Sequence, residues 1–80
     1  MNDISNLPKS QKRVLIILGK HEKEWLTVRQ MVKESGVNTY HVKLAILKFM
    51  KNYMVFIGKR GYEETVTISP DGMSLCRKLL

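Results

Sequence analysis

The chain has 80 residues, which is enough for one domain with a small core. Its composition, 44% hydrophobic and 26% charged, favours a folded chain over a disordered one. The single cysteine, Cys76, excludes an internal disulfide and is typical of a reducing compartment. The longest apolar run, Val14 to Leu18, is too short to cross a bilayer, and the N-terminus lacks the order of a signal peptide. We therefore expect a cytoplasmic protein, associated with the nucleoid if prokaryotic, with a flexible tail over 1–6 and one domain over 7–80.

The charge is strongly unbalanced. Fourteen Lys and Arg against 7 Asp and Glu give a formal net charge of +7 and a pI near 9.8. This balance favours a polyanionic partner, with nucleic acid ahead of an anionic membrane. Residues 4–21 and 35–62 contain no acid, so the sequence predicts a cationic face.

The first half of the chain predicts two helices. The first covers 8–20, with Leu15 and Leu18 in the core, and ends at the charged segment 21–24. Trp25 and Leu26 form a short extended piece. Thr27 and Gln30 then have the spacing of a capping box, which starts a second helix that ends before Ser35. Three apolar residues of this helix are expected in the core: Val28, Met31 and Val32.

A third helix follows closely. Gly36 suits a left-handed turn position and Asn38 is a good N-cap. Helical spacing then marks a buried stripe of Val42, Ala45, Ile46, Phe49 and Tyr53. Two helices joined by a short turn with a glycine form a helix-turn-helix.

The last part of the chain changes period from helix to strand. Residues 54–57 and 65–68 predict two strands, and 58–62, with two glycines, predicts the hairpin tip between them. Ser69 is expected to cap a final helix with Pro70 in its first position.

The order and spacing of these pieces resemble the winged helix-turn-helix superfamily, including the MarR-like and related prokaryotic regulators. The resemblance is carried by residues 25–31, 35–38 and 66–75, and by Val42 and Phe49 at the buried positions of the recognition helix. It implies an α+β fold with a three-helix core, a β-hairpin wing and a C-terminal helix. It also implies binding to double-stranded DNA as a transcriptional regulator. The family commonly has glycine where this chain has Tyr53, so we expect Asn52 to take the left-handed conformation instead.

In such proteins the N-terminal half of the recognition helix enters the major groove. The side of the third helix opposite its buried stripe carries Thr39, Tyr40, Lys43, Leu44, Leu47 and Lys51. Lys43 is expected to reach guanine acceptors, and Leu44 a thymine methyl. Thr39 and Tyr40 are expected to hydrogen-bond bases or phosphates, whereas Leu47 is expected to pack against the protein.

The predicted DNA-binding set is completed by residues outside this face. Asn38 starts the helix, and Arg29 on the preceding helix is expected to contact phosphate. Lys59 and Arg60 resemble wing residues that lie on the backbone or in the minor groove. The alternative for all these residues is an ordinary solvated surface.

Other classes of site have weak support in the sequence. His21, His41 and Cys76 lack the paired spacing of a zinc site, and no nucleophile, base and acid form a recognisable set. We therefore expect no metal, no cofactor, no small-molecule ligand, no membrane partner and no enzymatic activity.

Two questions stay open at this level. The apolar side of the first helix, with Leu75, Leu79 and Leu80, predicts a homodimer unless the core of one chain buries these residues. The function is either a sequence-specific regulator or an architectural or replication-associated DNA binder with little sequence preference. A third alternative is a winged helix that binds protein and not DNA.

Overall fold

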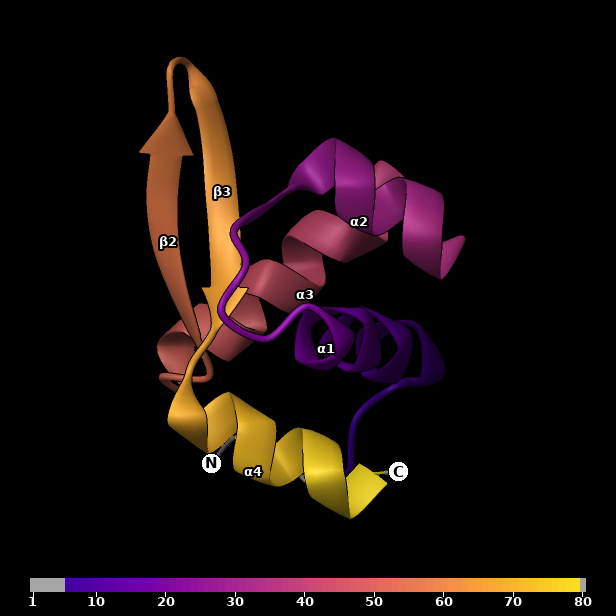
Figure 1. The fold of residues 1–80 in the computed structure, drawn as a ribbon. Helices are drawn as coiled ribbons and strands as arrows, with labels where there is room; N and C mark the ends of the chain where they lie inside the picture. The colour runs from indigo at the N-terminus through magenta and orange to yellow at the C-terminus, as the bar shows by residue number, and fades with distance from the viewer. Residues whose placement is uncertain (1–5, 80) are drawn as a thin grey trace.

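The computed structural model describes residues 6–79, so residues 1–5 of the predicted flexible tail, and Leu80, lie outside the described part. The element order confirms the predicted α+β fold (Figure 1). It is α1 (Lys9–Lys20), β1 (Leu26–Thr27), α2 (Val28–Ser35), α3 (Thr39–Lys51), β2 (Val55–Arg60), β3 (Glu63–Ile68) and α4 (Pro70–Leu79).

The three strands form one antiparallel sheet in the order β1-β3-β2. The short β1 pairs Leu26 with Val66, and β2 pairs Val55 with Ile68. The β2–β3 hairpin stands along one side of the helices, and α4 lies at the end of the molecule opposite the hairpin turn (Figure 1). The hairpin is therefore the wing.

The core is formed between α1 and the elements around it. α1 packs on α2, α3 and α4, and supplies Val14, Leu15 and Leu18, which are fully buried. The expected stripe on α3 is buried from Val42 to Phe49. Val28 and Val32 of α2 are only half-buried, whereas Met31 is buried as predicted.

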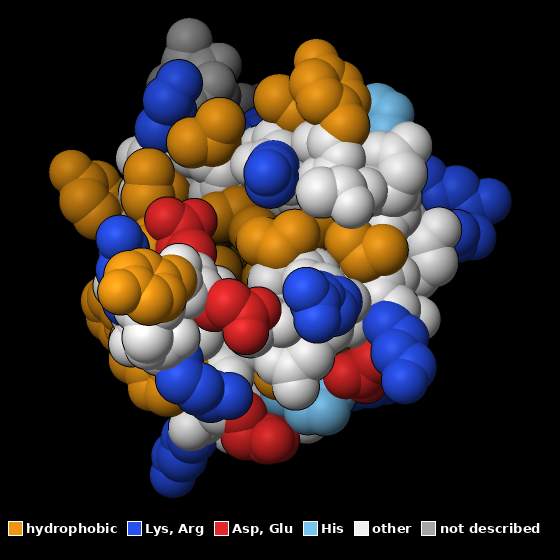
Figure 2. Space-filling view, turned by 90° about the horizontal axis from the view of Figure 1, so that it is seen from above, with side chains coloured by type: hydrophobic (Ala, Val, Ile, Leu, Met, Phe, Trp, Pro, Cys, Tyr) orange, Lys and Arg blue, Asp and Glu red, His pale blue; other side chains and the backbone are white. Residues whose placement is uncertain are grey.

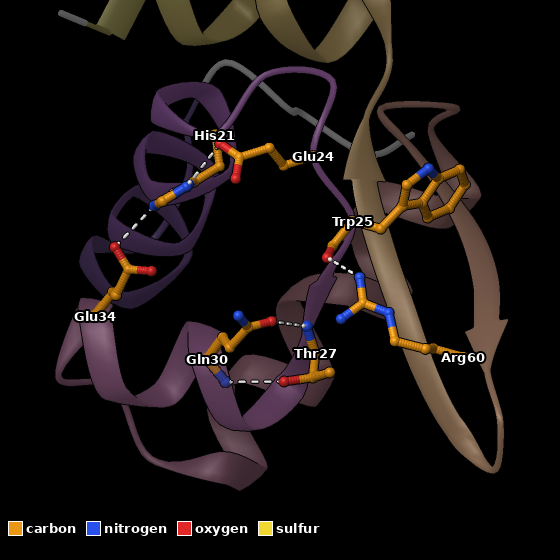
Figure 3. Close-up of polar contacts among 7 residues, drawn as sticks. All are labelled: His21, Glu24, Trp25, Thr27, Gln30, Glu34 and Arg60. Carbon is orange, nitrogen blue, oxygen red and sulfur yellow. Dashed lines mark hydrogen bonds and ion pairs between the residues drawn. The ribbon is translucent and has the colours of Figure 1, made fainter.

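The predicted caps of the helix-turn-helix are present. The Gln30 amide donates to Thr27 Oγ1 at 3.1 Å, and the Thr27 amide donates to Gln30 Oε1 at 2.8 Å (Figure 3). Gly36 has the left-handed φ of 73°. The His41 amide donates to Asn38 Oδ1 at 2.9 Å, which starts α3. These short-range bonds fix where α2 and α3 begin.

The end of α3 differs from the prediction. Tyr53, not Asn52, has the positive φ, at 59°, and Asn52 has a φ of −104°. The Met54 amide donates to the Phe49 carbonyl and the Tyr53 amide to the Met50 carbonyl, the bond pair of a Schellman motif. That motif places the left-handed residue one position after Asn52. Tyr53 is therefore 78% exposed and is not part of the buried stripe.

The wing also differs from the prediction. The strands extend to Arg60 and from Glu63, so the turn consists of Gly61 and Tyr62 and not of 58–62. Gly61 has a φ of 64°, as a tight hairpin turn needs, and Gly58 lies inside β2. The predicted position of Lys59 and Arg60 at the tip is wrong, because both belong to the last residues of β2.

α4 begins as predicted, and hydrogen bonds of Ser69 connect its start to the segment that follows α3. Ser69 Oγ accepts from the Gly72 amide at 3.1 Å and donates to the Tyr53 carbonyl at 2.7 Å. The Ser69 amide also donates to the Met54 carbonyl at 2.9 Å. Within residues 6–79, no helix combines the length and the apolar character that crossing a membrane requires.

Several of the apolar residues that motivated the homodimer are buried within one chain. Ile17 and Leu18 of α1 and Leu75 of α4 belong to the core. Leu79 is partly buried against it, and Leu80 lies outside the described residues. The homodimer through α1 and α4 stays a prediction.

Candidate nucleic-acid interface

The first turns of α3 present polar side chains to solvent. Thr39, Tyr40 and Lys43 are all exposed, as the phase of the buried stripe predicted. The Tyr40 ring meets the His41 ring edge-on, with centroids 5.4 Å apart. Asn38 is exposed too, but its side-chain oxygen already caps α3. Among residues 6–79, the N-terminal half of α3 therefore presents an exposed outer side.

A hollow of about 510 Å³ brings three of the predicted DNA-binding residues together. Arg29 of α2 and Thr39 and Lys43 of α3 line it, together with Val28 and Val32 of α2. Glu63 and Glu64 of β3 form its other side. Two cations and two carboxylates therefore border the same hollow.

The charges are mixed in space. Figure 2 views the molecule from the side of α2 and the hairpin turn, and shows acidic side chains among the Lys and Arg, with apolar side chains between them. On this surface, acidic side chains interrupt the cationic face predicted from the acid-free segments. The reason is the hairpin, which brings Glu63 and Glu64 back beside Lys43.

The two wing cations lie apart from this hollow. They line a smaller one of about 250 Å³ with Trp25, Gly58 and Thr65. The register places Lys59 opposite Glu64 and Arg60 opposite Glu63. Arg60 Nη2 donates to the Trp25 carbonyl at 3.3 Å, so its side chain turns back toward β1 (Figure 3). Tyr62, in the turn, is fully exposed.

The C-terminal half of α3 is apolar on its outer side. Leu44 is 40% exposed, and its contact with a thymine methyl stays a prediction. Leu47 lies near Ile57 of the wing but is 49% exposed, so the packing predicted for it is only partial. Met50, which the sequence did not single out, is 42% exposed. Lys51 is exposed at the far end, about 18 Å along the helix from Thr39.

Two titratable groups outside this interface have shifted pKa values. Hydrogen bonds to Glu34 (2.8 Å) and Glu24 (3.1 Å) raise the pKa of His21. The two carboxylates bind opposite ring nitrogens, so this trio does not converge on one metal ion. Burial raises the pKa of the Cys76 thiol, which disfavours a reactive thiolate.

Comparison with known proteins gives structural neighbours. No protein-family model and no curated protein sequence matches the chain. A MarR-family transcriptional regulator from Silicibacter pomeroyi superimposes with a TM-score of 0.85 at 18% identity, over 94% of this chain and 51% of that protein. BpsR of Bordetella bronchiseptica, whose DNA binding is regulated by 6-hydroxynicotinic acid, superimposes with a TM-score of 0.82 at 20% identity. The match covers 92% of this chain and 53% of BpsR.

A third neighbour was solved with DNA. The MepR–DNA complex from Staphylococcus aureus gives a TM-score of 0.80 at 13% identity, over 94% of this chain and 63% of that protein. The chain therefore spans between about half and two thirds of the length of these structures.

The helices, the sheet and the hairpin together form a winged helix-turn-helix fold. One of these structural neighbours is a MarR-family transcriptional regulator, which agrees with the resemblance seen in the sequence.

Proposed function

We propose that the chain is a transcriptional regulator that binds double-stranded DNA. In this proposal the N-terminal half of α3 enters the major groove, and the wing lies on the adjacent backbone or in the minor groove. The observation that carries this proposal is the exposed row Thr39, Tyr40 and Lys43 on the second helix of a helix-turn-helix, with Arg29 beside it. The net charge of +7 and the DNA complex of a structural neighbour support it. No catalytic step is part of the proposal.

The composition of α3 supports a second candidate function, an architectural DNA-binding protein with little preference for DNA sequence. Direct readout relies most on Arg, Asn and Gln, and the outer side of α3 has none of these. Asn38, just before α3, uses its side chain as a cap, and Glu63 and Glu64 border the hollow beside Lys43. An architectural DNA binder would need only phosphate contacts. Selection from a random duplex library separates the two candidates, since an architectural binder enriches no motif.

Titration of a labelled duplex at several salt concentrations tests DNA binding itself. With about four to six phosphates neutralised per chain, a log–log plot of affinity against salt should have a slope of about −4 to −5. The absence of binding at low salt, or a slope near zero, would exclude the proposal.

The Lys43→Ala variant locates the interface. It should weaken binding and reduce the salt slope by about one unit, because one phosphate or base contact is lost. Lys78→Ala is the matched control, because it removes the same charge from an exposed position on α4, which packs against α1 at the end of the molecule opposite the hairpin turn. Equal effects of the two substitutions would place the interface elsewhere.

A further inference from the structure

The outer side of α3 carries more apolar surface than DNA binding uses. Tyr40, Leu44, Leu47 and Met50 follow one another at helical spacing and are all at least 40% exposed. Protein–DNA interfaces are polar and rich in positive charge. Leu47 and Met50 lie in the half of α3 that does not lead into the major groove. Contiguous exposed apolar surface of this kind marks an interaction site.

The apolar residues border a groove between α3 and the wing. Leu47, Met50 and Ile46 of α3 and Ile57 of β2 line a hollow of about 320 Å³, with Lys43 and Glu64 at its edge. The stripe from Tyr40 to Met50 is about 15 Å long, which matches roughly three turns of a helix laid alongside it. A helix lying in such a groove is a recurring mode of peptide recognition.

The charged residues around the apolar stripe of α3 indicate which kind of partner would bind there. Lys43 lines the groove, Lys48 lies one helical turn after Leu44, and Lys51 is the last residue of α3. Glu64 is the one acid that lines this groove among the described residues. A second copy of the chain, itself carrying a net charge of +7, would be repelled. A partner with acidic residues beside its own apolar stripe would be attracted.

We propose that an amphipathic helix, with an apolar stripe flanked by Asp and Glu, docks between α3 and the wing. It covers Leu44, Leu47 and Met50 and neutralises the lysines beside them. Because Lys43 borders both this groove and the hollow shared with Arg29, the docked helix and DNA exclude each other. Only this competition rests on the proposed DNA binding. The docking itself does not.

A synthetic helix tests the docking directly. The probe is a labelled peptide with leucines at i, i+3, i+4 and i+7 and glutamates on both flanks, and its control is the same composition in scrambled order. Fluorescence anisotropy should show at least about tenfold tighter binding of the ordered peptide. In amide NMR spectra of the unmodified protein, the largest shifts should fall on α3 and β2. Equal affinity for the two peptides, or shifts centred on α1 and α4, would overturn the proposal.

Matched variants place the site. Leu47→Ser should weaken peptide binding by about tenfold or more, as loss of a central interface anchor does. Phe56→Ser removes a similarly exposed apolar side chain, but Phe56 neighbours Ile57 in β2 and so faces the other side of the sheet. It should leave peptide binding unchanged. Thermal melting verifies that both variants fold, and equal affinities of the two for the peptide would exclude the groove.

A competition experiment and direct binding measurements distinguish failure of the docking proposal from failure of the DNA-binding proposal. Unlabelled ordered peptide should displace a labelled duplex, and the scrambled peptide should not. If the protein binds the ordered peptide but no duplex, the DNA-binding proposal falls and the docking site stands. If it binds duplex but not the peptide, or binds both at once, the inference drawn here falls and DNA binding stands.

Discussion

At the scale of single residues, Tyr53 shows how a side chain is placed by a backbone requirement. Its φ of 59° is imposed by the Schellman motif that ends α3, and its ring gains little in return, since it is mostly exposed. A residue with a Cβ costs roughly 1–2 kcal/mol in this conformation. The position is therefore strained by its residue type and not by its surroundings.

Tyr53→Gly should stabilise the protein. Relief of the left-handed strain outweighs the extra flexibility of glycine in the unfolded chain, for a net gain of about 0.5–1 kcal/mol. Chemical denaturation measures the change in unfolding free energy. Tyr53→Ala is the control, because it removes the ring but keeps the Cβ, and it should give no such gain. Equal effects of the two substitutions would refute a backbone origin.

At the scale of elements, helix ends are joined by polar contacts at two places. His21, just after α1, bonds Glu34 near the end of α2, as well as Glu24 (Figure 3). Both ring nitrogens face a carboxylate, which requires the doubly protonated imidazolium for both bonds. Ser69 in the same way joins the start of α4 to the end of α3.

The His21 contacts should make stability depend on pH. The pKa of His21 is raised in the folded protein, so its contribution is fully present below the unfolded pKa of about 6.5. The contribution is lost as pH rises through the folded value. The difference in Tm between wild type and His21→Gln should be largest near pH 6 and should shrink toward pH 8.5. A difference that grows with pH would contradict the ion pairing, and Glu34→Gln should reproduce most of the effect.

The close packing of α4 against Met54 and Ile68 depends on the absence of a side chain at Gly72. A Cβ there would meet the Met54 carbonyl oxygen and lie 2.7 Å from Ile68 Cγ1. Since a carbonyl in the α3–β2 connection cannot yield as a flexible side chain does, Gly72→Ala should cost about 1–3 kcal/mol. Ser74→Ala, exposed on the same helix, should change stability by less than about 0.5 kcal/mol. Denaturation midpoints compare the two variants, and a tolerated Gly72→Ala would show that α4 is loosely docked.

At the scale of the whole molecule, the fold of the wing determines how acidic and basic side chains are distributed over the surface. Glu63 and Glu64 line the hollow shared with α3, while Lys59 and Arg60 line the smaller hollow that also contains Trp25. The cationic surface beside α3 is therefore narrower than the acid-free segments indicate.

Replacing both Lys59 and Arg60 by alanine should weaken DNA binding with little loss of stability, because both side chains are exposed. If they contact only phosphate, all duplexes lose affinity alike, and the salt slope shrinks by about one unit per lost contact. If Arg60 enters the minor groove, duplexes with an A-tract there lose more. The Arg77→Ala/Lys78→Ala double variant on α4 is the charge-matched control. Unchanged affinity and slope would mean that the wing does not contact DNA.

Local features of this protein follow from the sequence alone. The caps at Thr27 and Asn38, the buried phase of α3 through Phe49, and the element order depend on neighbours within about four residues, where spacing and residue type suffice. The exposure of Tyr40 and Lys43 follows from the same periodicity. That is why the fold class and the exposure of these two side chains were predicted correctly.

Only the tertiary structure decided the rest. The length of the wing depends on pairing between β2 and β3 and on Trp25 lying over Gly58, neither of which a local pattern encodes. The burial of Leu75 within one chain depends on α4 packing against α1. The juxtaposition of Glu64 with Lys43, and the groove beside Leu47, arise because the hairpin folds back along α3. Each is a contact between segments distant in sequence, so it is set by packing of the whole chain.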